Sequence, residues 1–259
     1  MKIQMGVLAR KVTTLSEYVG GLVLLLMQTI GWVFVPPLKR RQLVEQMEHM
    51  GVNSFLIVFL TAFFTGIVLA FQTAYTMRQM SAEIYIASLV SLSMTRELGP
   101  VLTALVVAAR VGASVTAEIG TMKVTEQIDA LETLATNPIK YLVVPRFLAL
   151  VIMLPLLTLY SDLVGITGGF LVGVTKLHIA PALYIKKTFD ALALKDVFTG
   201  LLKSVVFAAI IAIVGCFEGM RTRGGAEGVG RSTTKSVVIA CILVIASDCF
   251  FTALFYFML

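Results

Sequence analysis

Along this chain, apolar stretches of about 20 residues or more are separated by more polar segments. Residues 52–76 contain no charged side chain and are long enough to cross a bilayer, for which about 20 residues suffice. Four further apolar stretches follow, at about 85–109, 146–175, 197–217 and 236–259. The pattern predicts a bundle of five transmembrane helices.

An earlier apolar run, at 18–36, is long enough to cross but has basic residues on both sides. Lys2, Arg10 and Lys11 precede it, and Lys-Arg-Arg follows at 39–41. Because basic flanks stay in the cytoplasm, we expect this run to form an interfacial or re-entrant helix, with a sixth span as the alternative. The whole chain, 1–259, is expected to be one domain, with the interfacial region at 1–48 and the five-span bundle at 49–259.

The composition supports a membrane protein and gives its orientation. Of the 259 residues, 58% are apolar and 14% charged, and the mean hydropathy is +0.92, far above the balance of a soluble domain. With the N-terminus in the cytoplasm and the C-terminus outside, 14 of the 21 Lys and Arg residues lie on the cytoplasmic side and 5 on the other. The net charge of +6 therefore reflects topology, and we expect no nucleic-acid partner.

Side chains that could hold a metal or perform catalysis are few and scattered. The three cysteines lie in apolar stretches without metal-type spacing, and the two histidines, His49 and His178, fall on opposite sides of the membrane. GAEGVGRS (225–232) is similar to a phosphate-binding loop, but it lies between two spans and has Arg231 in place of the lysine. We expect a flexible cytoplasmic loop there, and no metal, cofactor or catalytic residue on this chain.

Besides Asp162, four charged residues fall inside the predicted spans. Arg96 and Glu97 interrupt the second span, Lys203 lies near the outer end of the fourth, and Asp248 lies in the fifth. At about 1.5 Å per residue, all four lie between the bilayer midplane and the outer leaflet. Such groups need partners or a wet cavity, so they form a structural ion-pair set, the polar wall of a substrate cavity, or both. Asp162 lies in the third span, and its role stays open.

The adjacent pair Arg96 and Glu97 sets a geometric condition. Successive side chains on a helix point about 100° apart, so these two cannot share one partner face. We therefore expect them to contact different groups.

A short amphipathic helix is predicted after the second span, on the cytoplasmic side. VTEQIDALETL (124–134) has apolar residues at spacings of four, three and three, and Asn137-Pro138 ends the helix. The other face carries acidic residues at 126, 129 and 132. Interfacial anchors are rich in Lys and Arg instead, so this helix, at about 122–136, is better explained as a docking site for a protein partner.

Three stretches carry a family resemblance. RELGPVLTALVVAARVGASVTAEIGTMKVTEQIDALETLATNPIKYLVVPR (96–146) resembles the core of the MlaE/YrbE family of ABC-transporter permeases. KSVVFA (203–208) and SDCFFTALF (247–255) resemble the last two spans of that family. The resemblance covers nearly the whole chain. It implies an all-α integral membrane protein, with an N-terminal interfacial helix, five transmembrane helices and a cytoplasmic coupling helix.

The resemblance also implies a function and a set of partners. The chain would be the non-catalytic subunit of an ATP-driven transporter that moves glycerophospholipid and maintains outer-membrane lipid asymmetry. It would form a homodimer in the inner membrane, with a cytoplasmic ATPase that binds ATP and Mg²⁺, and a STAS-domain protein on that ATPase. A hexameric MCE-domain protein in the periplasm would exchange lipid with it.

Two groups of site residues follow from the same resemblance. One group would line or support the lipid cavity: Arg96, Glu97, Lys203 and Asp248, with Leu69, Met77 and Met80 as equivalents of apolar contacts near the first span. The other would couple the chain to its ATPase: Glu118, Lys123, Glu126, Gln127, Ile128, Asp129 and Leu131.

Three other classes compete with this interpretation. An ion-coupled secondary carrier would use Glu97 and Asp248 as a proton relay, and it would not need ATP. A membrane scaffold would use the intramembrane charges only to lock helices together. An intramembrane lipid-modifying enzyme would need a nucleophile and a base, for which the sequence contains no recognisable set.

Overall fold

The computed structural model describes residues 2–36, 40–79 and 82–258, and in these ranges every regular element is a helix. The predicted all-α membrane fold is therefore confirmed. Six segments are long and apolar enough to cross a membrane: Ser16–Val33, Arg40–Gln79, Glu83–Val124, Ile139–Thr175, Leu194–Met220 and Gly225–Phe255. The first of these satisfies the length and composition of a span, so its interfacial position stays a prediction.

The N-terminal half consists of three helical stretches. The first is α1 (Lys2–Val33). The second contains α2 (Arg40–Met50), η1 (Val52–Ser54) and α3 (Phe55–Gln79). The third runs from Glu83 to Val124 through η2 (Glu83–Tyr85), α4 (Ile86–Ser93), η3 (Met94–Leu98), α5 (Gly99–Val107), η4 (Ala108–Gly112) and α6 (Ala113–Val124). The helix of the predicted second span continues past 109 to Val124 and passes through the π-helical turns η3 and η4.

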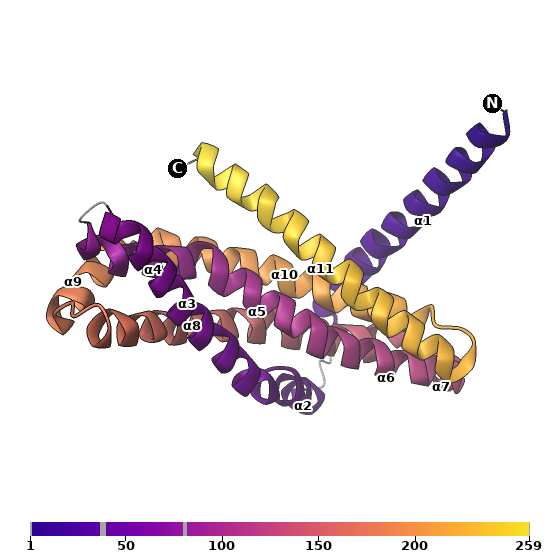
Figure 1. Ribbon diagram of the computed structural model, residues 1–259. Helices are drawn as coiled ribbons and strands as arrows, with labels where there is room; N and C mark the ends of the chain where they lie inside the picture. The colour runs from indigo at the N-terminus through magenta and orange to yellow at the C-terminus, as the bar shows by residue number, and fades with distance from the viewer. Residues whose placement is uncertain (1, 37–39, 80–81, 259) are drawn as a thin grey trace.

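The C-terminal half has two short and three long helices. They are α7 (Gln127–Thr133), η5 (Ile139–Val143) with α8 (Val144–Thr175), α9 (Pro181–Ala191), α10 (Leu194–Met220) and α11 (Gly225–Met258). In Figure 1, α7 lies at one end of the elongated bundle and α9 at the other, while α1 and the C-terminal part of α11 project away from it.

Glycines allow α3 and α8 to pack backbone to backbone. A Cβ added to Gly66 on α3 would collide with the carbonyl group of Gly165 on α8, and one added to Gly168 would lie 2.5 Å from the carbonyl oxygen of Phe63. Small residues at such crossings let membrane helices approach closely. The crossing fixes α8 beside α3, which lines the apolar groove described below.

Two local expectations are wrong. Residues 225–232 are not a loop but the first turns of α11: Gly224 and Gly225 have positive φ values of 90° and 67°, which make the turn, and Glu227 then pairs with Arg231 one turn later at 2.6 Å. The coupling helix expected at about 122–136 is only α7. It is shortened because Glu126 has a left-handed backbone, with φ 59°, and this breaks it from α6.

Candidate functional site

The site begins with a proline that frees a backbone carbonyl inside the third stretch. In a regular helix the N–H of residue 100 would bond to the carbonyl of Arg96, but Pro100 has no N–H. The chain forms a π turn at this point, with the N–H of Gly99 donating to the carbonyl of Met94. The free carbonyl of Arg96 accepts a hydrogen bond from Lys203 Nζ, at 3.2 Å. Single π turns often occur at functional positions.

Lys203 is the centre of a charged cluster that joins three helices. Its side chain is 2% exposed, and Nζ lies 2.8 Å from Glu97 Oε2 and 2.9 Å from Asp248 Oδ1. Nζ also donates to Thr252 Oγ1 at 2.8 Å, and the Thr252 hydroxyl donates to Glu97 at 3.0 Å. The buried ammonium on α10 thus holds together η3, which carries Glu97, and α11, which carries Asp248 and Thr252.

Arg96 has a separate partner. Its Nη2 lies 2.7 Å from Asp196 Oδ1, and the other oxygen of Asp196 accepts the backbone N–H of Ala193 at the start of α10. The Asp196 side chain is 5% exposed whereas that of Arg96 is 49% exposed. The expectation that Arg96 and Glu97 contact different groups is confirmed. The buried carboxylate fixes a guanidinium whose other face remains open.

The charged residues border one pocket, and a separate apolar groove lies along α3. The pocket has a volume of about 390 Å³ and is lined by Arg96, Glu97, Lys195, Asp196, Thr199, Lys203, Thr252 and Phe255. The groove, of about 300 Å³, is lined by Phe64, Thr65, Val68, Leu69, Gln72 and Leu98. The two share no lining residue, but η3 contributes to both, through Glu97 to the pocket and through Leu98 to the groove. A charged and an apolar space on one helical turn suit a ligand with a charged head and an apolar tail.

The structure brings together the four charged residues that the sequence singled out, and Leu69 lines the apolar groove. Met77 lines neither the pocket nor the groove, although it packs against the same cluster of α3, α4 and α8 as Leu69. Met80 lies outside the described residues. Asp162 is buried on α8 beside Gly99, and its Oδ1 makes no hydrogen bond within the described part of the chain.

Sequence reasoning missed Asp196 and Thr252. Helical spacing carried the signal for both: Asp196 precedes Lys203 by two turns on α10, and Thr252 follows Asp248 by one turn on α11. Each therefore lies on the same face as a residue that had already been identified.

The expected coupling residues are distributed around the junction of α6 and α7. Ile128 is buried against the bundle, Leu131 is partly buried, and Glu126, Gln127 and Asp129 are exposed. The remaining two are held within the fold.

These two, Lys123 and Glu118, make ion pairs with the chain itself. Lys123 Nζ lies 2.7 Å from Asp129 Oδ1, and Glu118 Oε2 lies 3.0 Å from Arg146 Nη2, whose side chain is 7% exposed. The exposed side of α7 carries the acidic side chains of Glu126 and Glu132, and Glu118 helps to anchor α6 to α8 behind it.

A bundle of apolar helices with a charged pocket between its spans, and a short acidic helix exposed at one end, has the organisation of a membrane transport protein. Comparison of sequences specifies the family. The family described as Permease MlaE matches residues 43–254, and the chain belongs to it. It is thus the permease subunit of an ABC transporter, a subunit that is not itself catalytic and implies an ATPase partner.

Relatives of the chain come from bacteria and from a red alga. A probable ABC transporter permease protein of Rickettsia typhi is 47% identical over 241 residues, which cover 93% of each chain. One of Synechocystis sp. is 46% identical over 219 residues, 85% of this chain and 83% of the relative. One of Porphyra purpurea is 43% identical over 196 residues, 76% of this chain and 74% of the relative.

Proposed function

We propose that this permease moves glycerophospholipid between the inner membrane and a periplasmic carrier of the MCE-domain class, and so maintains outer-membrane lipid asymmetry. The observation that carries the proposal is that η3 lines both a charged pocket, through Glu97, and an apolar groove, through Leu98. A phospholipid has the same two parts, a phosphate headgroup and acyl chains. An inorganic ion or a small polar solute has no apolar part that the groove could bind.

Arg96 is the residue best placed to bind the phosphate. Asp196 occupies the Nε and Nη2 edge of the guanidinium through one carboxylate oxygen, so donors remain for a second anion. The exposed ammonium of Lys195 lies at the same pocket. Lys203 has a structural role instead. It is enclosed by two carboxylates and a hydroxyl, and it stabilises the wall of the pocket.

The proposal includes the partners and the orientation. The chain would act as a homodimer in the inner membrane, with its N-terminus in the cytoplasm and its C-terminus in the periplasm. A cytoplasmic ATPase would bind ATP and Mg²⁺ and dock on α7, with a STAS-domain protein attached to it, and a hexameric MCE-domain protein would receive or deliver lipid at the α9 end. The exposed carboxylates of Glu126 and Asp129 favour a basic groove on the ATPase.

Lipid transfer by the reconstituted complex tests the substrate. With its native partners in proteoliposomes, the permease is expected to transfer fluorescent phospholipid to the carrier when ATP is supplied, and Arg96→Gln is expected to lower the rate at least tenfold. Arg78→Gln is the matched control, because Arg78 is also about half exposed and paired with a carboxylate, Glu83, but lies outside the pocket. Equal rates for the two variants would overturn the assignment of Arg96, and transfer without ATP would favour an ion-coupled carrier.

Co-purification tests the docking surface separately. Reversing the charges of Glu126 and Asp129 to lysine is expected to release the ATPase from the purified complex while the permease stays folded. Glu45→Lys on α2 is the control, because Glu45 is likewise an exposed acid on a helix and belongs to a different surface. An ATPase that is retained in full by the α7 variant would contradict docking on this helix.

A further inference from the structure

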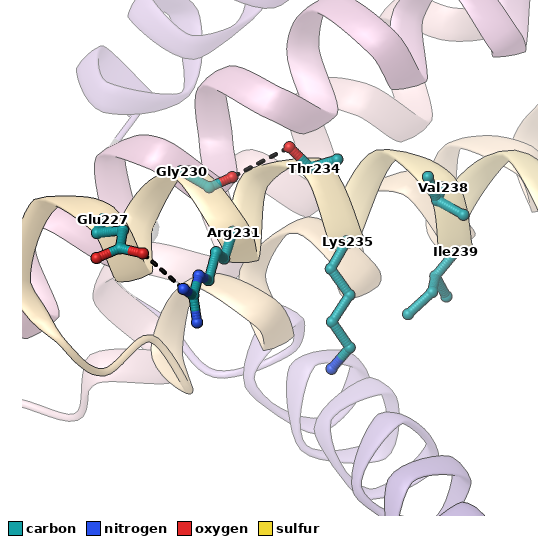
Figure 2. A pocket seen from close by; sticks show the side chains of 7 residues that line it. All are labelled: Glu227, Gly230, Arg231, Thr234, Lys235, Val238 and Ile239. Atoms are coloured by element: carbon teal, nitrogen blue, oxygen red, sulfur yellow. Dashed lines mark hydrogen bonds and ion pairs between the residues drawn. The ribbon is translucent and has the colours of Figure 1, made fainter.

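A second pocket lies near the start of α11, at the end of the bundle that carries α7 (Figures 1 and 2). It has a volume of about 740 Å³ and is lined by Glu227, Gly230, Arg231, Thr234, Lys235, Val238 and Ile239. At 1.5 Å per residue, Lys235 lies about 20 Å along α11 from Asp248. The pocket is therefore separate from the charged pocket at η3.

The two cations of this pocket are held in different ways. Arg231 pairs with Glu227 at 2.6 Å, but both side chains are about 80% exposed and the two residues are one helix turn apart. Exposed ion pairs of this kind contribute little to stability, so the guanidinium can exchange the carboxylate of Glu227 for a phosphate at low cost. Lys235 lies 2.9 Å from the buried carboxylate of Glu218, while its own side chain is 54% exposed. Lys235 is thus fixed in place and still faces the pocket.

Aromatic residues from α1 and α10 support this arrangement. The hydroxyl of Tyr18 donates to Glu218 at 2.6 Å, and Lys235 Nζ lies 4.9 Å from the centre of the Tyr18 ring. Arg221 lies 5.0 Å from the ring centre of Phe217. The buried acid is therefore satisfied by two groups, and the basic side chains are ordered around it.

Positive charge exceeds negative charge around the pocket. Its lining contains two cations (Arg231 and Lys235) and one carboxylate (Glu227). The carboxylate of Glu218, which is buried, pairs with Lys235 from behind. The lining itself therefore has a net excess of one positive charge, which favours an anionic ligand.

The lining changes from polar to apolar along the helix axis. In Figure 2, Arg231, Lys235 and Ile239 project from the same side of α11. Further along, Val238, Ile242 and Ile245 lie at helical spacing and are 52%, 60% and 55% exposed. Along α11 the two cations and Thr234 come first and the exposed aliphatic side chains follow, as the polar headgroup precedes the acyl chains in a leaflet.

We propose that this pocket binds an anionic glycerophospholipid of the leaflet at the α7 end, with the phosphate on Arg231 and Lys235 and an acyl chain along Val238, Ile242 and Ile245. Basic pockets between membrane helices on the cytoplasmic side suit anionic headgroups. The site goes beyond the transport pocket, because it would hold a lipid on the outer face of α1 and α11 rather than between the spans that carry Arg96 and Lys203.

Photolabelling in nanodiscs tests the site. The full-length chain is placed in phosphatidylcholine nanodiscs that contain a few per cent of phosphatidylglycerol with a photoreactive group in its acyl chain, and the labelled peptides are identified by mass spectrometry. We expect label on residues 238–245, and Arg231→Gln is expected to reduce it about fivefold, as for one basic residue lost beside an anionic lipid. Arg41→Gln is the control, because Arg41 also pairs with an acid one turn away, Glu45, but lies on α2. It should leave the labelling unchanged.

Three results would overturn the proposal. Equal labelling by a phosphatidylcholine probe, unaffected by Arg231→Gln, would mean that the face contacts bulk lipid only. Protection of residues 238–245 together with cross-links between copies there would mean that a second copy of the chain covers the face. Competition by free glycerol phosphate as strong as by phosphatidylglycerol would mean a site for a soluble anion. Arg96→Gln is expected to leave the labelling unchanged, so failure here is distinguishable from failure of the proposed transport function.

Discussion

Replacing Lys203 tests whether one ammonium group holds the charged cluster together. Lys203→Met keeps most of the volume of the side chain and removes its charge. In the variant the carboxylates of Glu97 and Asp248, which both lie within 2.9 Å of Nζ in the native chain, lose their common counter-charge. They then repel each other inside a region that offers little water.

The size of the effect follows from burial. Removing one partner of a buried ion pair costs about 3–5 kcal/mol, because the remaining charge is left uncompensated. Glu97 is 39% exposed and Asp248 20% exposed, so water screens part of the repulsion, and we expect a loss near the lower end, about 3 kcal/mol. This corresponds to a change of about a hundredfold in the unfolding equilibrium constant. Reversible unfolding by dodecyl sulfate in mixed micelles measures the change.

A control and a compensating variant make the test specific. Lys195→Met removes the same charge from the same pocket, but Lys195 is exposed and has no ion pair within the described residues, so a change below about 0.5 kcal/mol is expected. Adding Glu97→Gln to Lys203→Met removes one of the two stranded charges and is expected to restore about 1–2 kcal/mol. The reasoning is refuted if Lys203→Met unfolds with the wild type, or if the second substitution makes it worse.

Three further predictions concern the elements around the cluster. Pro100→Ala supplies an N–H that competes for the carbonyl of Arg96; hydrogen exchange should show the new amide protected, with stability changed by less than about 1 kcal/mol. Gly66→Ala inserts a Cβ into the backbone of α8 and should destabilise by about 1–3 kcal/mol, whereas Gly31→Ala, which meets nothing within 4 Å, should be neutral or slightly stabilising in the same unfolding assay. Asp196→Asn loosens the guanidinium of Arg96 and should speed its modification by phenylglyoxal about fivefold, and an unchanged rate would contradict the positioning role of Asp196.

The intramembrane cluster was predictable because a charged side chain inside an apolar span must face other polar groups or a wet cavity. Arg96, Glu97, Lys203 and Asp248 each stood out against their neighbours, and charges at similar depth in a bundle are expected to find one another. Asp196 did not stand out, because it lies in the first turn of α10, where an acid complements the helix dipole and needs no further explanation. Its place on the same face as Lys203 follows from helical spacing, but its contact with Arg96 depends on the reach of that side chain.

The ends of α6, α7 and α11 were less predictable, because they depend on backbone angles that the sequence pattern does not show. An apolar period extending through Val124 and Ile128 suggested one helix, but Glu126 adopts the left-handed conformation and separates α6 from α7. Glycines in 225–232 suggested a loop, whereas Gly224 and Gly225 alone make the turn and the later ones are accommodated within α11. In both places the positive φ angles of one or two residues decide where a helix begins or ends.

The unbroken run from Glu83 to Val124 has a mechanical consequence for any transport cycle. Its 42 residues extend about 60 Å, so the end that carries α7 and the turn that carries Glu97 belong to a single rod. No loop interrupts this helix, so a displacement of one end is expected to move the other end as well. Between η3 and Val124, the rod departs from regular α-helical geometry at η4 (Ala108–Gly112). If this helix bends during a transport cycle, we expect the bend at that five-residue turn.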